Sequence, residues 1–291
     1  MLVEYYPTHP FDECILSWNS MRPEEQWRFW LSLHTPAGWS DWLLYAEWGA
    51  TGQRTFQSDS PTAYTFQDTA HPKQGLADGL RVRVEGKNLS TDLKMIPCLS
   101  QLSQFGLQMP SSPLSLVTLP GFGRSQIALP HPHAHRLCSP TSVVNAIERL
   151  TKQKLDPLLF AQKVHDSGFD IYGNWVLNTA EAYCALGGAY RCYVTRLAHF
   201  EALHRYLLKR LPVVVSVKGE LPGALLPYSE GHLLCVTGYC PEKGVLCIDP
   251  AYKTDEATQA HYPLRPFLEA WGQRKNLAYV FELDNIPKIG I

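Results

Sequence analysis

The sequence predicts an α+β protein with a β-sandwich-like N-terminal domain followed by a domain in which helices precede an antiparallel sheet. Between residues 12 and 97, short aromatic and aliphatic segments alternate with clusters of Pro, Gly, Asn, Asp and Ser, a pattern typical of closely spaced strands. From residue 139 onward, apolar residues first recur at helical spacing and then form short apolar runs. Hydrophobic residues make up 45% of the 291 residues, which is enough for a sizeable core.

The N-terminal strands are predicted from their alternation. In residues 79–86, apolar Leu80, Val82 and Val84 alternate with charged residues, which indicates a half-buried antiparallel strand. The other predicted strands are 13–20, 26–35, 39–49 and 93–100. Six tryptophans crowd this region: Trp18, Trp27, Trp30, Trp39, Trp42 and Trp48. We interpret them as the core of a sandwich in preference to a ligand platform.

A Pro- and Ser-rich stretch, 102–116, separates the two parts. We therefore expect an N-terminal domain at 1–106, a linker at 107–116 and a second domain at 117–291. In the second domain, helices are predicted after Ser139-Pro140, over 157–168, from about 178 and over 199–210. The predicted strands follow at 212–219, 232–240, 244–250 and 277–283.

Cys138 stands where a nucleophilic thiolate is favoured. Ser139 and Pro140 open the predicted helix, and proline suits the first helical turn. The thiol of Cys138 therefore meets free N–H groups and the positive end of the helix dipole, which lower a cysteine pKa. Its backbone N–H is also placed to bind a developing oxyanion.

A base and an orienting acid are predicted on a later hairpin. His232 opens the strand at 232–240, and Asp249 ends the next strand after a turn at 241–244. The hairpin brings the start of the first strand beside the end of the second. Asp249 can then fix the tautomer of His232 and stabilise its imidazolium form.

These segments resemble peptidase family thirty-nine-like cysteine peptidases of the papain superfamily. The matching residues are Cys138-Ser139-Pro140-Thr141-Ser142, Gly173-Asn174-Trp175 with Asn178-Thr179-Ala180, Gly231-His232-Leu233-Leu234 with Val236-Thr237-Gly238, Asp249-Pro250-Ala251, Tyr193 to Leu197, Phe267 to Trp271 with Ala278-Tyr279-Val280, and Leu119-Pro120 with Ser125-Gln126. The N-terminal region also resembles the domain that precedes the peptidase in many bacterial members, at 17–19 and 39–42.

The resemblance implies further site residues. In this family the Gln of the Ser-Gln element donates to the oxyanion, a role that falls to Gln126. Asn174 and Trp175 are implied to line the substrate cleft, although a turn followed by a core tryptophan is an equal interpretation. The residue before the cysteine, often tryptophan in the family, is Leu137 here.

The run His131, His133 and His135 allows two interpretations. At alternate positions of an extended chain, three histidines would face one side and could bind zinc. Two prolines, one before His131 and one after it, and the lack of a nearby carboxylate favour a loop that borders the cleft, with His133 at the substrate entrance. This loop also offers groups that could substitute for Gln126. No metal or other cofactor is expected.

The implied function is hydrolysis of a peptide or protein substrate through an acyl-enzyme. Two alternatives stay open: an acyl or amide transferase on the same triad, and a binding module whose site is retired. A net charge of −1 does not favour nucleic acid, and no apolar run is long enough to span a membrane. Without a standard signal peptide, we expect a cytoplasmic protein or one exported by another route. The oligomeric state is not predicted.

Overall fold

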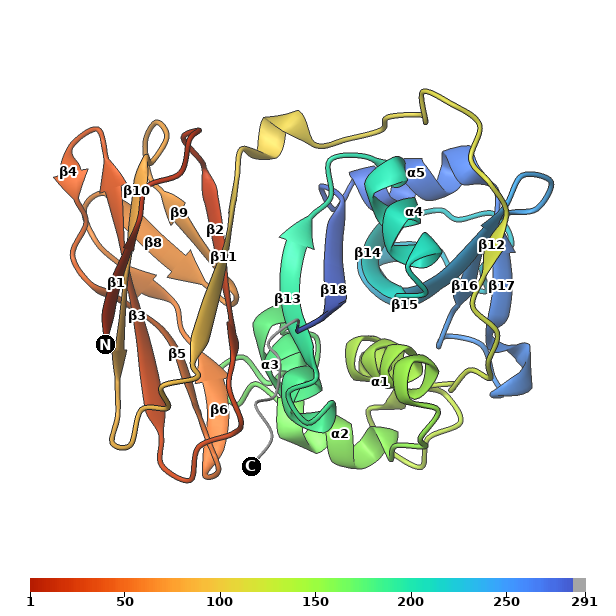
Figure 1. The fold of residues 1–291 in the computed structure, drawn as a ribbon, viewed down its shortest axis with the longest axis horizontal. Coiled ribbons are helices and arrows are strands. Elements are labelled where there is room, and N and C mark those ends of the chain that lie inside the picture. Colours follow the sequence, from red (N-terminus) through yellow and green to blue (C-terminus); the bar gives the residue numbers. More distant parts are fainter. Residues whose placement is uncertain (285–291) are drawn as a thin grey trace.

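The computed structural model describes residues 1–284, which form five α-helices and three antiparallel sheets (Figure 1). The first sheet runs in the order β1 (Leu2–Tyr5), β10 (Gly79–Glu85), β3 (Trp27–Thr35), β5 (Leu43–Gly49) and β6 (Gly52–Thr55), with β4 (Gly38–Trp39) paired to β3. The second runs in the order β11 (Lys94–Ser100), β2 (Glu13–Asn19), β9 (Thr69–Pro72), β8 (Ala63–Phe66) and β7 (Ser58–Asp59). The five predicted N-terminal strands are present, and the unpredicted ones are short.

The third sheet holds most of the remaining strands. Its order is β13 (Tyr190–Arg196), β18 (Leu277–Leu283), β14 (Val213–Gly219), β15 (Tyr228–Cys240), β16 (Gly244–Ile248) and β17 (Gln259–Tyr262), with β12 (Val117–Thr118) paired to β15. The α-helices are α1 (Cys138–Thr151), α2 (Pro157–Val164), α3 (Trp175–Ala185), α4 (Phe200–Leu208) and α5 (Leu264–Gly272), and short 3₁₀ turns lie at Leu102–Gln104, Ala134–Arg136 and Glu256–Thr258. Among residues 1–284, none of these helices is both long and apolar enough to cross a bilayer.

Several predictions for the second part need correction. Helices and strands are interleaved, because β13 precedes α4 and α5 lies between β17 and β18. Helix α3 begins at Trp175, since the side chain of Asn174 accepts a hydrogen bond from the Leu177 N–H and caps the helix earlier than expected. Strand β15 begins at Tyr228, so His232 lies inside the strand and does not open it.

The tryptophan interpretation holds for half of the set. Trp18, Trp27 and Trp48 are fully buried, and Trp18 stacks on Phe29 with ring centroids 4.3 Å apart. Trp30, Trp39 and Trp42 are only partly buried and lie beneath the guanidinium groups of Arg81 and Arg83. These three pack as cation–π partners outside the core.

A single hydrophobic cluster crosses from the N-terminal sheets into the second part. Buried Trp18 and Phe29 belong to the same cluster as Val144 of α1, Leu177 of α3 and Phe281 of β18. In Figure 1 the second sheet lies beside β13 and β18. A second cluster lies where β14 and β15 pack against α4 and α5. The chain therefore has a continuous core on the side where its two parts meet.

Polar contacts accompany this shared core. The Asn19 side chain donates to the Cys192 carbonyl at 2.7 Å and accepts from the Cys192 N–H at 3.0 Å. Glu13 of β2 and Arg196 of β13 form an ion pair at 2.6 Å, and each side chain is only 4% exposed. The side chains of β2 thus satisfy the backbone of β13, which lies at an edge of the third sheet.

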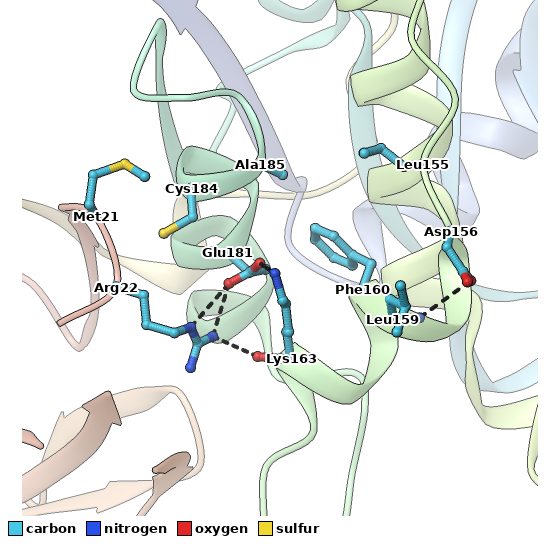
Figure 2. A pocket seen from close by; sticks show the side chains of 10 residues that line it. All are labelled: Met21, Arg22, Leu155, Asp156, Leu159, Phe160, Lys163, Glu181, Cys184 and Ala185. Atoms are coloured by element: carbon cyan, nitrogen blue, oxygen red, sulfur yellow. Dashed lines mark hydrogen bonds and ion pairs between the residues drawn. The ribbon is translucent and has the colours of Figure 1, made fainter. Parts of the chain in front are cut away.

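A pocket of about 430 Å³ also lies at this junction, where Met21 and Arg22 meet α2 and α3 (Figure 2). Arg22 donates to the Glu181 carboxylate at 3.0 Å and to the Lys163 carbonyl at 2.8 Å, while the Lys163 ammonium lies 3.3 Å from Glu181. The pocket's central charges are therefore paired with one another. None of the residues predicted for catalysis or substrate binding lines it.

We predict that Arg196→Leu destabilises the protein by about 3–5 kcal/mol, because it leaves the Glu13 carboxylate buried without its partner. Urea unfolding followed by circular dichroism measures this loss. Arg265→Leu is the control, since Arg265 and Glu269 are 69% and 48% exposed. It should change stability by about 1 kcal/mol or less. Equal losses in the two variants would contradict the prediction.

Candidate active site

Cys138 is the first residue of α1, as predicted. The residue before it, Leu137, provides no side-chain cap, so the first N–H groups of the helix are left for other acceptors. Burial raises the pKa of the Cys138 thiol, and the backbone N–H groups of Leu233 and Ser139 act to lower it. These groups, one on β15 and one at the helix start, favour the thiolate form.

Two hydroxyl groups anchor the start of α1 to the third sheet. The Ser139 hydroxyl hydrogen-bonds the Tyr279 hydroxyl of β18 at 3.0 Å. The Ser142 hydroxyl donates to the carbonyl of Leu233, the residue after His232, at 2.9 Å. These bonds hold the helix start against the part of β15 that carries His232.

His232 interacts with both Asp249 and Cys138. Its Nε2 lies 2.8 Å from Asp249 Oδ1, and the imidazole lowers the pKa of the Cys138 thiol. Because Nε2 faces the carboxylate, Nδ1 is the ring nitrogen left for the sulfur. Asp249 directly follows β16, and the pairing of Cys235 with Ile248 places the end of that strand beside β15. The predicted hairpin therefore brings His232 and Asp249 together.

Asp249 is completely buried and has four hydrogen-bond donors around it. Tyr228 and Tyr262 each donate a hydroxyl to Oδ2 at 2.6 Å. Oδ1 accepts from the Ala251 N–H at 2.9 Å in addition to its contact with His232. Tyr228 also stacks on His232, with ring centroids 4.1 Å apart and planes inclined by 16°. The carboxylate and imidazole are therefore held in both position and orientation.

These contacts shift all three pKa values toward a charged site. Burial opposes ionisation of Asp249, but His232 and the two tyrosine hydroxyls outweigh it and lower the pKa of the carboxyl below 3.8. Burial likewise disfavours the imidazolium, yet Asp249 and Cys138 raise the pKa of His232 to about 10. Burial raises the pKa of Cys138, and His232 with the two backbone N–H groups reverses this and lowers it. The three shifts act in the direction that favours a thiolate–imidazolium pair.

The other perturbed thiols have the opposite tendency. Burial raises the thiol pKa of Cys14, Cys184, Cys192, Cys235 and Cys247. The pKa of Cys184 rises to about 12, and its sulfur donates to the Ser20 carbonyl at 3.4 Å. All eight cysteines are free thiols. These five behave as buried structural residues.

Comparison with known families assigns this region. The model of the Peptidase_C39 like family matches residues 122–279, more than half of the chain. The chain belongs to the Peptidase_C39 like family. The matched range contains Cys138, His232 and Asp249, and residues 1–121 lie outside it. No curated protein and no solved structure matches the chain.

Gln126, the oxyanion donor implied by the resemblance, is buried. Its backbone N–H donates to the carbonyl of Pro250, the residue after Asp249, at 2.9 Å. Its side-chain Nε2 donates to the Ala134 carbonyl at 3.1 Å. Because an amide nitrogen has two hydrogens, one donor of this group is left. Oε1 is buried without a partner among the described residues.

The histidine run is a turn that leads into the 3₁₀ segment at Ala134–Arg136. The rings of His131 and His133 lie 5.8 Å apart, and those of His133 and His135 lie 6.4 Å apart. His131 also packs edge-on against Tyr172. Within residues 1–284, no group of three or more His, Cys, Asp and Glu side chains is arranged to hold a metal ion.

The three residues predicted to bind substrate differ in their accessibility to solvent. Asn174 is fully buried, and its amide nitrogen donates to Thr55 at 3.0 Å and to Asp166 at 2.9 Å. The buried side chain is not accessible to a substrate, which makes Asn174 the cap of α3 and not the cleft residue that was expected. Trp175 is partly exposed and His133 is exposed, so both are accessible from solvent.

Sequence reasoning missed Tyr228 and Tyr262. Tyr228 precedes the predicted start of its strand, and Tyr262 lies on β17, which was not predicted. The register of β17 against β16 places Tyr262 opposite Val245, and only its long side chain reaches Asp249, through the hydroxyl. The only signal in the sequence was that Tyr228 lies four residues before His232. This spacing does not reveal that the tyrosine hydroxyl contacts Asp249.

We predict that Tyr262→Phe raises the pKa of Asp249 by removing one donor from its carboxylate. Because the folded-state pKa lies below 3.8, ionised Asp249 stabilises the protein above that pH, and the stabilisation is lost as pH falls through the folded value. The variant should therefore unfold at a higher pH during acid titration. It should also lose about 1.5–3 kcal/mol at pH 7, as expected for a hydrogen bond to a charged group.

Circular dichroism during acid titration and urea unfolding measures both effects. Tyr252→Phe is the matched control, because the Tyr252 hydroxyl donates to the Gly223 carbonyl at an exposed position. An acid transition of Tyr262→Phe that coincides with that of Tyr252→Phe would show that the hydroxyl does not stabilise the carboxylate.

Proposed function

We propose that the chain is a cysteine peptidase that hydrolyses an amide bond in a peptide or protein, with Cys138 as nucleophile, His232 as acid and base, and Asp249 as the orienting group. The observation that carries this proposal is the 2.8 Å contact of His232 with the buried Asp249 carboxylate, together with the position of Cys138 at a helix N-terminus, where His232 lowers the pKa of its thiol. Membership of the Peptidase_C39 like family supports the same class of reaction.

The proposed reaction has two halves. The Cys138 thiolate attacks the carbonyl carbon, and the imidazolium of His232 gives its Nδ1 proton to the leaving amine as the C–N bond breaks. This leaves a thioester on Cys138 and a neutral imidazole. His232 then takes a proton from the water that attacks the thioester carbon. The C–S bond breaks, the carboxylic acid is released, and the Cys138 thiolate is left beside the imidazolium, which restores the starting pair.

Asp249 and the helix start stabilise charge during these steps. Asp249 stays ionised because its donors lower its pKa, so His232 has a counterion whenever it is protonated. The donors assigned to the oxyanion are the Cys138 backbone N–H and the remaining Nε2 hydrogen of Gln126. The contacts of Gln126 with Ala134 and Pro250 support this role because they fix its side chain and its backbone.

We propose that residues 117–291 form a papain-like peptidase domain and residues 1–106 a β-sandwich-like domain joined to it by 107–116. The stretch between the 3₁₀ turn at Leu102–Gln104 and β12 contains no regular element, which supports this division. Trp175 and His133 are assigned to the substrate side of the site, since both are accessible.

The experiment is turnover of a peptide library by the whole chain, with products read by mass spectrometry. We predict that Cys138→Ala lowers turnover by about a thousandfold or more, because removal of a covalent nucleophile leaves only binding and oxyanion contributions. Cys184→Ala should retain wild-type turnover, since the raised pKa keeps that thiol protonated.

Acid quenching during turnover adds a direct test of the intermediate. The wild-type chain should carry an acyl group on the Cys138 peptide, and Cys138→Ala should carry none. Turnover that persists in Cys138→Ala would overturn the proposed function.

A further inference from the structure

Arg274 lies beside the proposed catalytic base, in the turn between α5 and β18. Its guanidinium carbon is 5.9 Å from the ring centroid of Trp175. A Cβ on Gly231, the residue before His232, would lie 3.4 Å from the same carbon. The guanidinium therefore lies close to the backbone next to His232.

The turn that carries Arg274 is held from behind by buried groups. Arg196 donates through Nη1 to the carbonyls of Arg274 and Lys275, at 2.8 and 2.9 Å. Arg196 is itself fixed by its buried pair with Glu13. Asn276 donates to the Leu197 carbonyl at 3.0 Å, which ties the end of the turn to β13. Arg274 thus extends from a rigid support and not from a loose surface loop.

The guanidinium is only partly satisfied by the protein. Nε of Arg274 donates to the Ser216 hydroxyl of β14 at 3.0 Å, and this is the side chain's only hydrogen bond to residues 1–284. No carboxylate of the described residues lies within 4.0 Å of it. Glu230 is exposed and is two residues from His232, yet it forms no ion pair with Arg274. The two Nη groups are left for an external acceptor.

The positive charge of Arg274 also acts on groups near the start of α1. Arg274 is close enough to lower the pKa of Tyr279, although burial raises that pKa overall. Tyr279 in turn hydrogen-bonds Ser139, the residue after Cys138. Trp175, which faces the guanidinium, packs with Cys138 against the same hydrophobic cluster. Arg274 therefore borders the reacting groups without contacting the thiol in this structure.

We propose that Arg274 forms a subsite for a substrate carboxylate next to the bond that is cleaved. The inference rests on the proposed peptidase function and names its substrate class: peptides with an acidic side chain or a free C-terminal carboxylate near the scissile bond. A half-buried guanidinium with two free Nη groups suits bidentate binding of a carboxylate. The Trp175 ring fixes the plane of the fork by cation–π contact.

The test is kcat/KM of the full chain on matched peptides selected from its own cleavage products. One arm replaces Glu by Gln at each position flanking the cleaved bond, and the other replaces a free C-terminal carboxylate by an amide. The wild type should prefer the carboxylate about ten- to hundredfold in one arm, the size expected for a charged hydrogen bond. A preference lost with the Glu-to-Gln peptides identifies an acidic side chain as the group bound, and one lost with the amidated peptides identifies the C-terminal carboxylate.

Arg274→Gln should abolish that preference while leaving cleavage of the uncharged peptide within about twofold. Arg274→Glu should prefer a Lys peptide over the Glu peptide, a reversal that a purely structural role does not produce. Arg265→Gln, on the exposed face of α5, is the control and should keep the wild-type preference. Alkylation of Cys138 by iodoacetamide should be unchanged in Arg274→Gln.

Two results would overturn the inference alone: wild-type turnover without a carboxylate preference, or an equal loss in Arg274→Gln on charged and uncharged peptides. Absence of cleavage of any peptide by the wild type would instead overturn the proposed function and this inference with it.

Discussion

A buried negative charge on Asp249 is the constraint on which the candidate site depends. An ionised carboxylate removed from water is costly unless its lone pairs are satisfied and a counterion is near. Here two tyrosine hydroxyls and one backbone N–H surround it, and His232 supplies the positive charge. The same carboxylate raises the pKa of the imidazole, and the imidazole in turn lowers the pKa of the Cys138 thiol. The groups around Asp249 come from β15, from β17 and from the residues that follow β16.

The N-terminal sheets contribute to the geometry of this site without entering it. Strand β2 satisfies the backbone of β13, and its Glu13 fixes Arg196, whose guanidinium holds the turn behind Arg274. On the other side, Thr55 hydrogen-bonds both Asn174 and Asp166, and Asp68 accepts the Trp175 N–H at 2.6 Å. The turn that carries Arg274 and the start of α3 are therefore both supported by residues outside the family match. This offers a physical reason for the two parts of the chain to share one hydrophobic core.

Sequence patterns were sufficient where structure is decided locally. The helix start at Cys138 follows from Ser139-Pro140, and the meeting of His232 with Asp249 follows from one short hairpin. Sequence patterns were insufficient where contacts between residues far apart in the chain determine the structure. The donors to Asp249 arrive from the start of β15 and from β17, and the cap at Asn174 bonds to Thr55, far earlier in the chain. The fold class was predictable because periodicity reports burial, whereas the interleaving of β13 and α5 depends on tertiary packing that no local pattern records.

The most direct measurement of the central claim is the rate of iodoacetamide alkylation at Cys138 as a function of pH, read by mass spectrometry in the wild type and in His232→Gln. If His232 and Asp249 maintain a thiolate, Cys138 should react well below the ordinary thiol pKa of about 8.5. It should react faster than the other cysteines, and the variant should lose most of this reactivity at low pH. A wild-type profile that follows an ordinary thiol, or one that His232→Gln leaves unchanged, would contradict the account.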